Sequence, residues 1–177
     1  MIKPSQPRIL LVLLSMVIGF TFFFGVREQV CGKDKPILAE QILINKSARR
    51  LTLIRAGEAL RVYRISLGNS PIGPKEREGD GKTPEGEYVV DKKIMNSGFH
   101  RALHISYPNA ADRARAASLG VSPGGDIMIH GLKNGFGWLG PLHRFSDWTQ
   151  GCIAVTNAEI EEIWDMVPVG TPVKIVP

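Results

Sequence analysis

The sequence contains little cysteine: Cys31 and Cys152 are its two cysteines among 177 residues. Two cysteines are too few for the disulfide framework that stabilises many small secreted domains. The four histidines do not stand at the close spacings of a tight zinc motif, such as H-E-x-x-H or paired C-x-x-C. We therefore expect neither a bound metal nor any other cofactor.

The sequence also lacks a strong excess of charge. The net charge is +5, and aromatic residues make up only 7% of the chain. No basic stripe with interleaved aromatic residues and no nucleic-acid-binding motif is present, so we expect no nucleic acid partner. The modest positive charge instead suits an anionic peptide or an acidic polymer. Without internal repeats or low-complexity segments, the length fits one domain with an N-terminal appendage.

Long hydrophobic runs are confined to one stretch, residues 9–26, which carries no charge and follows Lys3 and Arg8. It reaches the lower length range of a transmembrane helix, roughly 17–25 residues, and exceeds the roughly 7–15 apolar residues of a signal peptide. We expect an apolar helix that anchors the chain in a membrane. A signal segment cleaved after Gly32 or Ala39 is the alternative. The expected segments are a cytoplasmic N-terminus at 1–8, the anchor at 9–26, a linker at 27–40 and a folded domain at 41–177.

The folded domain shows more strand signals than helix signals. Residues 41–67 alternate apolar and polar side chains at period two, with turn residues at 45–47 and 56–58. One helix is expected over 110–119, capped by Asn109, and a second begins at the capping box Thr156–Glu159. Further strands are expected over 87–91, 102–106, 126–130, 152–155 and 173–176. The pattern predicts a mainly β domain, either a sandwich or a partly open barrel, with two short helices.

A histidine and a cysteine stand where they could carry nucleophilic catalysis. His130 ends the apolar run 126–130, and Cys152 follows Gly151 and precedes the apolar run 153–155. A thiol needs a neighbouring base at neutral pH, because free cysteine titrates near ~8.5. It also needs backbone amides that hold an oxyanion, and a preceding glycine permits their close approach to substrate. We expect Cys152 as nucleophile, His130 as proton acceptor and donor, and the Gly151 backbone in the oxyanion site. The alternative is a buried cysteine beside a histidine that only packs.

The pattern of His130, a glycine, a gap and then Thr149–Cys152 resembles the catalytic domain of the L,D-transpeptidases, the YkuD-like family. Thr83–Tyr88 is similar to a Thr-Pro-x-Gly-x-aromatic segment of that family. Lys75–Gly81, together with Ser106–Asn109, is similar to one of its subgroups. The resemblance covers most of the chain beyond the linker and implies an L,D-transpeptidase-type β-sandwich.

The resemblance also implies an activity. Such an enzyme forms a thioester between its cysteine and a peptidoglycan stem peptide, then transfers the acyl group to an amine, in cell wall biogenesis that sets cell shape. We therefore expect an inner-membrane anchor with the domain in the periplasm, or release into the periplasm after signal cleavage. One alternative is a hydrolase of the same fold that releases stems or a wall-attached protein. Another is a non-catalytic module that binds the cell wall.

Two positions depart from the family pattern. Gln150 stands where the family commonly has a histidine, and Ala154 stands where it commonly has arginine or asparagine. Glutamine donates hydrogen bonds but does not titrate. Alanine removes a polar group that would hold substrate. These departures keep the nucleophile and the base, but they leave the choice between transfer and hydrolysis open.

Two loops are long enough to contribute to a site. The segment 131–149 is long for a loop inside a compact domain, and its glycines and aromatic residues predict a mobile lid over Cys152. Arg144 within it could clamp a substrate carboxylate or lie solvated. The loop 68–83 is expected to be a solvated surface loop or a rim that contacts substrate. The expected substrate-binding residues are Gly131, Trp138, His143, Arg144, Thr149 and Gln150.

Overall fold

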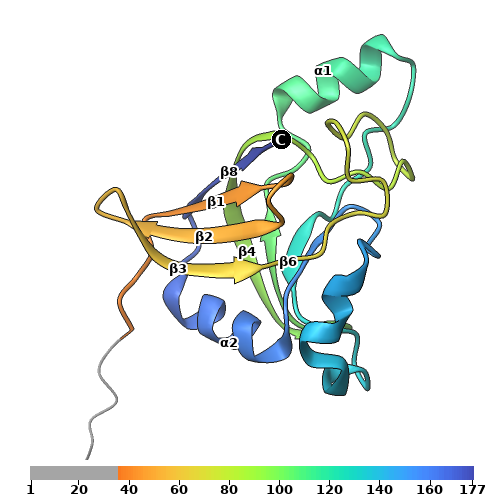
Figure 1. Ribbon diagram of the computed structural model, residues 1–177. Coiled ribbons are helices and arrows are strands. Elements are labelled where there is room, and N and C mark those ends of the chain that lie inside the picture. The colour runs from red at the N-terminus through yellow and green to blue at the C-terminus, as the bar shows by residue number, and fades with distance from the viewer. Residues whose placement is uncertain (1–35) are drawn as a thin grey trace, which may run out of the picture. The chain divides into compact units, whose positions relative to one another are not determined.

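The computed structural model describes residues 36–177 (Figure 1). It contains one eight-stranded sheet, two α-helices and a 3-10 helical segment, η1. The elements are β1 (Gln41–Asn45), β2 (Arg50–Arg55), β3 (Glu58–Arg64), β4 (Gly86–Ser97), β5 (His100–Ile105), α1 (Ala110–Ser118), β6 (Met128–His130), η1 (Gly137–Phe145), β7 (Ile153–Ala154), α2 (Asn157–Met166) and β8 (Pro172–Val176). The mainly β architecture predicted from the sequence is confirmed.

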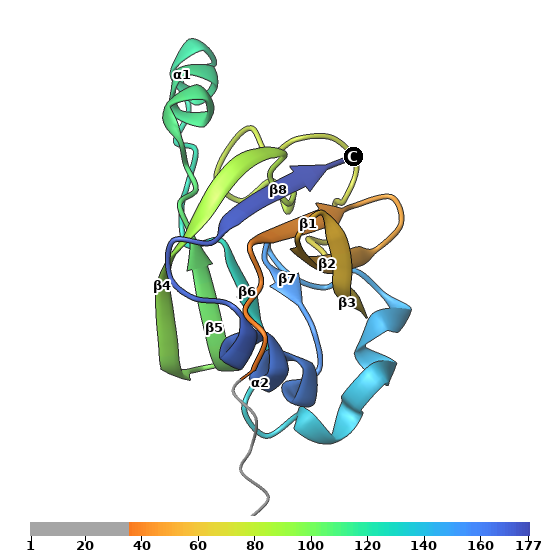
Figure 2. The ribbon, with the colours of Figure 1, turned by 90° about the vertical axis from the view of Figure 1, so that its left-hand side faces the viewer.

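The strands lie in the order β3-β2-β1-β8-β4-β5-β6-β7. An antiparallel β1–β3 meander forms one half of the sheet, and β8 joins it to β4 by pairing parallel to β1 and antiparallel to β4. The long strand β4 carries two irregularities in its pairing with β5, and bulges of this kind bend a sheet. The bend brings the chain after β3 back to β7, through bridges between Ser66 and Ala154 and between Gly68 and Thr149 (Figure 2).

The period-two alternation produces a core on one face of the meander. Ile42 and Ile44 of β1 are fully buried, as are Leu51 and Leu53 of β2, while the residues between them are less buried. The two-residue turn that joins β2 and β3 has positive φ at both Ala56 and Gly57, which is the geometry of a tight hairpin. Burial of large aliphatic side chains at roughly 25 cal/mol per Å² is the main stabilising term of this sheet.

The two expected helices form where the capping signals place them. Asn109 caps α1, and Thr156 caps α2 in a complete capping box with Glu159. Helix α2 buries Ile160 and Ile163 in the core and packs against β5, so it lies across the lower end of the sheet in Figure 1, opposite α1. The sequence predicts two helices, and the structure has a third helical segment, η1, inside 131–149.

Several strand boundaries differ from those expected. Strand β6 begins at Met128 instead of 126, because Asp126 has φ of 55° and cannot extend the ladder. Strand β7 begins at Ile153, so Cys152 precedes it. The expected apolar helix at 9–26 lies outside the described residues. Within residues 36–177, no helix is both long and apolar enough to span a membrane.

Candidate active site

Strands β6 and β7 bring the predicted nucleophile and base together. They pair in parallel, with Ile129 opposite Ile153 and His130 opposite Ala154. Side chains two apart share a face of a strand, so Cys152 and His130 are diagonal neighbours on one face. Both line a cavity of about 440 Å³, which confirms that the fold places these two side chains in one site.

His130 is held in the form that accepts a proton. Its side chain is buried, and Nδ1 lies 2.6 Å from the Gly131 carbonyl oxygen. A carbonyl only accepts, so Nδ1 carries the proton and Nε2 keeps a free lone pair. The ring is flanked by Phe99 and Trp148, with ring centroids 4.6 Å and 5.9 Å away. Burial lowers the pKa of His130 below its usual value of 6.5, and the Gly131 carbonyl opposes this only in part. His130 is therefore neutral at pH 7 and able to act as a base.

Cys152 rests as a neutral thiol. Burial raises the pKa of the Cys152 thiol, and the carboxylate of Asp126 raises it further. The Met128 amide and the positive charge of Lys75 act in the opposite direction, and their effect is smaller. Sγ lies 3.5 Å from the carbonyl oxygen of Asp126, to which the thiol donates weakly. The resting pair is thus a thiol beside a neutral imidazole, and the thiolate forms when the proton moves to His130.

The cavity around the pair is mostly apolar and has one carboxylate at its edge. Its walls come from the β4–β5 turn, from the start of β6 and from the residues before Cys152. Asp126 contributes the carboxylate, and its side chain is 89% exposed. The lining residues are Ser97, Gly98, Phe99, Asp126, Met128, His130, Trp148, Thr149, Gln150 and Cys152.

Thr149 and Gly151 fix the backbone around the thiol. The Thr149 hydroxyl donates to the Cys152 carbonyl at 2.7 Å and accepts from the Gly151 amide at 3.1 Å. Gly151 has φ of 128°, and a Cβ there would lie 2.7 Å from the Lys82 carbonyl oxygen, so only glycine fits. The Gly151 amide is therefore already engaged. Within residues 36–177, the Cys152 amide donates to no protein acceptor, which makes it the better candidate to hold an oxyanion.

Only some of the expected substrate-binding residues line the cavity of Cys152. Thr149 and Gln150 line the cavity of Cys152, whereas Trp138 is 75% exposed and lies outside its lining. Gly131 contributes through its carbonyl, which holds His130. Arg144 forms an ion pair with Glu159 and so ties η1 to the capping box of α2.

His143 faces a different part of the molecule. It is buried, and its Nδ1 lies 3.2 Å from the Ser66 hydroxyl and 3.4 Å from the indole nitrogen of Trp148. Burial lowers the pKa of His143 to about 4, so it is neutral at pH 7. It lines a second, apolar cavity of about 350 Å³, and Trp148 lines both this cavity and that of Cys152. The structure does not bring His143, Arg144 or Trp138 to the thiol.

Sequence reasoning placed Trp148 in the segment expected to cover Cys152, and Trp148 lines the cavity, but it missed Phe99 and Asp126. Phe99 and Trp148 flank the base, and Asp126 places both a carbonyl and a carboxylate at the nucleophile. The apolar run predicts a strand from residue 126, and a positive φ at aspartate carries no sequence signal beyond its tolerance of that conformation. The sequence predicts either a solvated surface loop or a substrate-contacting rim over 68–83, and it does not predict that Lys75 and Thr83 are buried within this loop.

Comparisons with known proteins identify the family of the chain. The family model of the L,D-transpeptidase catalytic domain (YkuD) matches residues 39–175. The L,D-transpeptidase-family protein YafK of Escherichia coli strain K12 is 34% identical over 132 residues, which are 71% of this chain and 46% of YafK. The chain thus spans about half the length of that relative.

Solved structures show the same fold. The helical cell shape determining protein Pgp2 of Campylobacter jejuni superposes with a TM-score of 0.58 and 28% identity, over 80% of this chain and 51% of Pgp2. The L,D-transpeptidase of Xylanimonas cellulosilytica superposes with a TM-score of 0.51 and 19% identity, over 79% of this chain and 61% of that chain. At that identity the second similarity concerns the fold alone.

Proposed function

Because this chain belongs to the L,D-transpeptidase family, we propose that it is a cysteine acyltransferase that acts on peptidoglycan stem peptides. The observation that carries the proposal is that the neutral His130, with a free Nε2, lies on the same face of the sheet as the Cys152 thiol and in the same cavity. A structural cysteine would not need a base held in one tautomer beside it. The substrate class comes from the family, and the nucleophile and base come from the site.

The reaction divides into two steps that use the same groups. In the first, Nε2 of His130 takes the thiol proton while Sγ of Cys152 attacks the carbonyl carbon of a diamino-acid residue, and the Cys152 amide holds the oxyanion. The bond to the terminal D-amino acid breaks, its amine takes the proton from His130, and a thioester remains. In the second step His130 accepts a proton from an incoming amine, a new amide forms, and the proton returns to the cysteine sulfur.

Hydrolysis of the same thioester is the second candidate, and one observation favours it. The segment 131–149 is expected from the sequence to cover Cys152, yet only its last two residues, Trp148 and Thr149, line the thiol cavity. Arg144 ties η1 to α2, and no residue of η1 lines the thiol cavity. Transfer needs water excluded and an amine held in place. Gln150 and Ala154 supply fewer polar contacts for that amine than the family pattern does.

Mass spectrometry of the products tests the proposal directly. The full chain is incubated with a purified tetrapeptide stem and a diamino-acid acceptor, and Cys152→Ala serves as the inactive control. Cross-linked stems in excess of free tripeptide support transfer. Tripeptide alone, even at high acceptor concentration, makes the protein a hydrolase. Neither product, together with a Cys152 that resists alkylation at neutral pH, leaves a non-catalytic wall-binding module.

We also propose that residues 9–26 anchor the chain in the inner membrane, with the catalytic domain in the periplasm. The support is the uncharged apolar run in the sequence and the location of the wall substrate. The alternative is a domain released into the periplasm after cleavage near the linker at 27–40. A wall-attached protein as acceptor or as released product would need the same location.

A further inference from the structure

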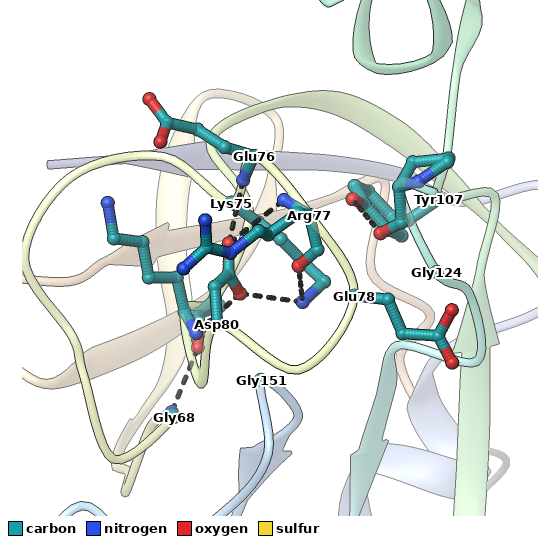
Figure 3. A network of polar contacts seen from close by, with 12 residues as sticks. Gly68, Lys75, Glu76, Arg77, Glu78, Asp80, Tyr107, Gly124 and Gly151 are labelled. Carbon is teal, nitrogen blue, oxygen red and sulfur yellow. Dashed lines mark hydrogen bonds and ion pairs between the residues drawn. The ribbon is translucent and has the colours of Figure 1, made fainter. Parts of the chain in front are cut away.

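The loop at residues 68–83, named here the clasp, contains a buried ion pair and lies beside Gly151, the residue before Cys152 (Figure 3). Lys75 Nζ lies 2.7 Å from Asp80 Oδ1, and the two side chains are 3% and 8% exposed. A buried ion pair adds little stability compared with apolar residues of similar size, because desolvation offsets its attraction. Stability alone therefore does not explain why this charged loop buries an ion pair. A second role of buried ion pairs is to fix one conformation of the backbone around them.

Asp80 organises the clasp by accepting several hydrogen bonds. Its carboxylate accepts from the amides of Glu76, Arg77 and Lys82 at 2.8, 3.1 and 3.0 Å, in addition to Lys75. Lys75 in turn donates to the Arg77 carbonyl at 3.0 Å. Burial alone would raise the pKa of Asp80, but Lys75 and the three amides hold it at about 2. The Asp80 carboxylate is therefore ionised at neutral pH.

One side of the clasp packs against the backbone that precedes Cys152. A Cβ at Gly68 would lie 3.0 Å from the Gly151 Cα, and a Cβ at Gly151 would lie 2.7 Å from the Lys82 carbonyl oxygen. Two backbone hydrogen bonds join the start of the clasp to Thr149, which donates to the Leu67 carbonyl and accepts from the Asn69 amide. Asp80 accepts a hydrogen bond from the Lys82 amide, and the Lys82 carbonyl lies against Gly151. Lys82 therefore links the ion pair to Gly151.

The other side of the clasp holds the segment that leads to Asp126. The Glu78 amide donates to the Ser122 carbonyl at 2.8 Å, and the Ser122 hydroxyl donates to the Glu78 carboxylate at 3.0 Å. A Cβ at Gly124 would lie 3.2 Å from the Glu78 Cβ, so the two chains are in close contact. This segment ends at Asp126, whose carbonyl accepts from Cys152. The clasp thus touches both stretches of backbone that border the thiol.

We propose that Lys75 and Asp80 are positioning residues, whose buried ion pair holds the clasp against the two backbone segments that border Cys152. This inference rests on the proposed function only in taking Cys152 as the reacting group. Loss of the pair frees the Lys82 carbonyl from its fixed place beside Gly151, and the Cys152 backbone moves with it. The charge of Lys75 adds to the effect, because it lowers the pKa of the thiol.

The test uses thiol reactivity and backbone exchange in a Cys31→Ala background, so that Cys152 is the remaining cysteine. Lys75→Met should move the midpoint of iodoacetamide alkylation to higher pH and slow alkylation at pH 7 by about tenfold, a change of about one pKa unit. Asp80→Asn should speed amide hydrogen exchange at 149–152 and at 122–126. Lys75→Arg keeps the charge and should retain most of the parent reactivity.

A matched control separates positioning from stability. Ile44→Val removes one buried methylene from β1, which does not border the cavity, and should lower the unfolding temperature without changing either readout. If Lys75→Met and Asp80→Asn lower the unfolding temperature but leave alkylation and local exchange at parent values, the inference is wrong. If Lys75→Met does not fold, exchange in Asp80→Asn decides. Shifted reactivity without any product from stem peptides would uphold the positioning role and defeat the proposed function.

Discussion

At the scale of single residues, the site depends on two side chains whose pKa values move apart. Burial lowers the pKa of His130 and raises that of Cys152, so both are neutral near pH 7. An ion pair between thiolate and imidazolium would need the opposite shifts. The proton therefore moves during attack on the substrate, and the base is needed in every turnover.

This arrangement predicts the pH dependence of turnover. Because only neutral His130 accepts the proton, kcat/KM should rise with pH through an apparent pKa below the usual 6.5 of histidine and then stay level through neutrality. In His130→Ala the rate should instead follow formation of the free thiolate and keep rising through pH 9. Steady-state rates between pH 4 and pH 10 check both profiles. An acid limb in the parent that persists unchanged in His130→Ala would assign the base to another residue.

The carboxylate at the edge of the cavity predicts a variant with a more reactive thiol. Asp126 raises the pKa of Cys152, so Asp126→Asn should lower it and speed alkylation at pH 7 by about two- to fivefold, less than one pKa unit. Asparagine tolerates the φ of 55° at this position, so the backbone carbonyl that meets Sγ stays in place. Alkylation rates against pH measure the shift. Slower alkylation in this variant would mean that Asp126 supports the thiolate.

At the scale of elements, Arg144 connects η1 to α2 and does not line the cavity of Cys152. Its guanidinium pairs with Glu159, which also accepts from the Thr156 amide and hydroxyl. Arg144→Ala should therefore destabilise the domain by about 1–3 kcal/mol and increase proteolysis within 137–145. The KM for a stem peptide should stay within about twofold of the parent. A tenfold rise in KM would restore the role of Arg144 as a carboxylate clamp.

The elements divide into those the sequence predicts and those it does not. Strands β1 and β2 and the helix at 157–166 follow from period-two alternation and a capping box, which are local signals. Segment η1 could not be predicted, because Arg144 finds its partner on α2, fifteen residues away. The burial of Lys75 in the clasp could not be predicted, because charged residues among glycines are typical of solvated loops.

The candidate site divides in the same way. Cys152, His130 and Thr149 were found from their order in the motif, and the fold brings all three to one cavity. Phe99, from the β4–β5 turn, reaches His130 because β5 pairs with β6 and places Ala102 opposite His130. Contacts of this kind depend on topology, and no spacing in the sequence records them.

At the scale of the whole molecule, the sequence predicts that residues 9–26 anchor the chain in a membrane. If residues 9–26 span the inner membrane, the full chain should stay in the membrane fraction after carbonate extraction, and external protease should digest the domain in spheroplasts. A variant with two charged substitutions, Leu13→Lys and Ile18→Lys, should lose this retention, because each charge at mid-membrane costs about 2.5–3.5 kcal/mol. A mature N-terminus near Lys33 or Glu40 would show a cleaved signal.

Strand order also has a consequence for how the domain folds. Strand β8 comes last along the chain, yet it lies between β1 and β4 near the centre of the sheet. Until residues 172–176 are available, β1 pairs only with β2 and β4 only with β5, so the edge of each strand that faces β8 stays unpaired and the sheet is incomplete. Contacts between the two ends of a chain give high contact order and slow folding. Closure of the sheet is therefore expected to wait for β8, so the two halves of the domain join only after the last strand has been synthesised.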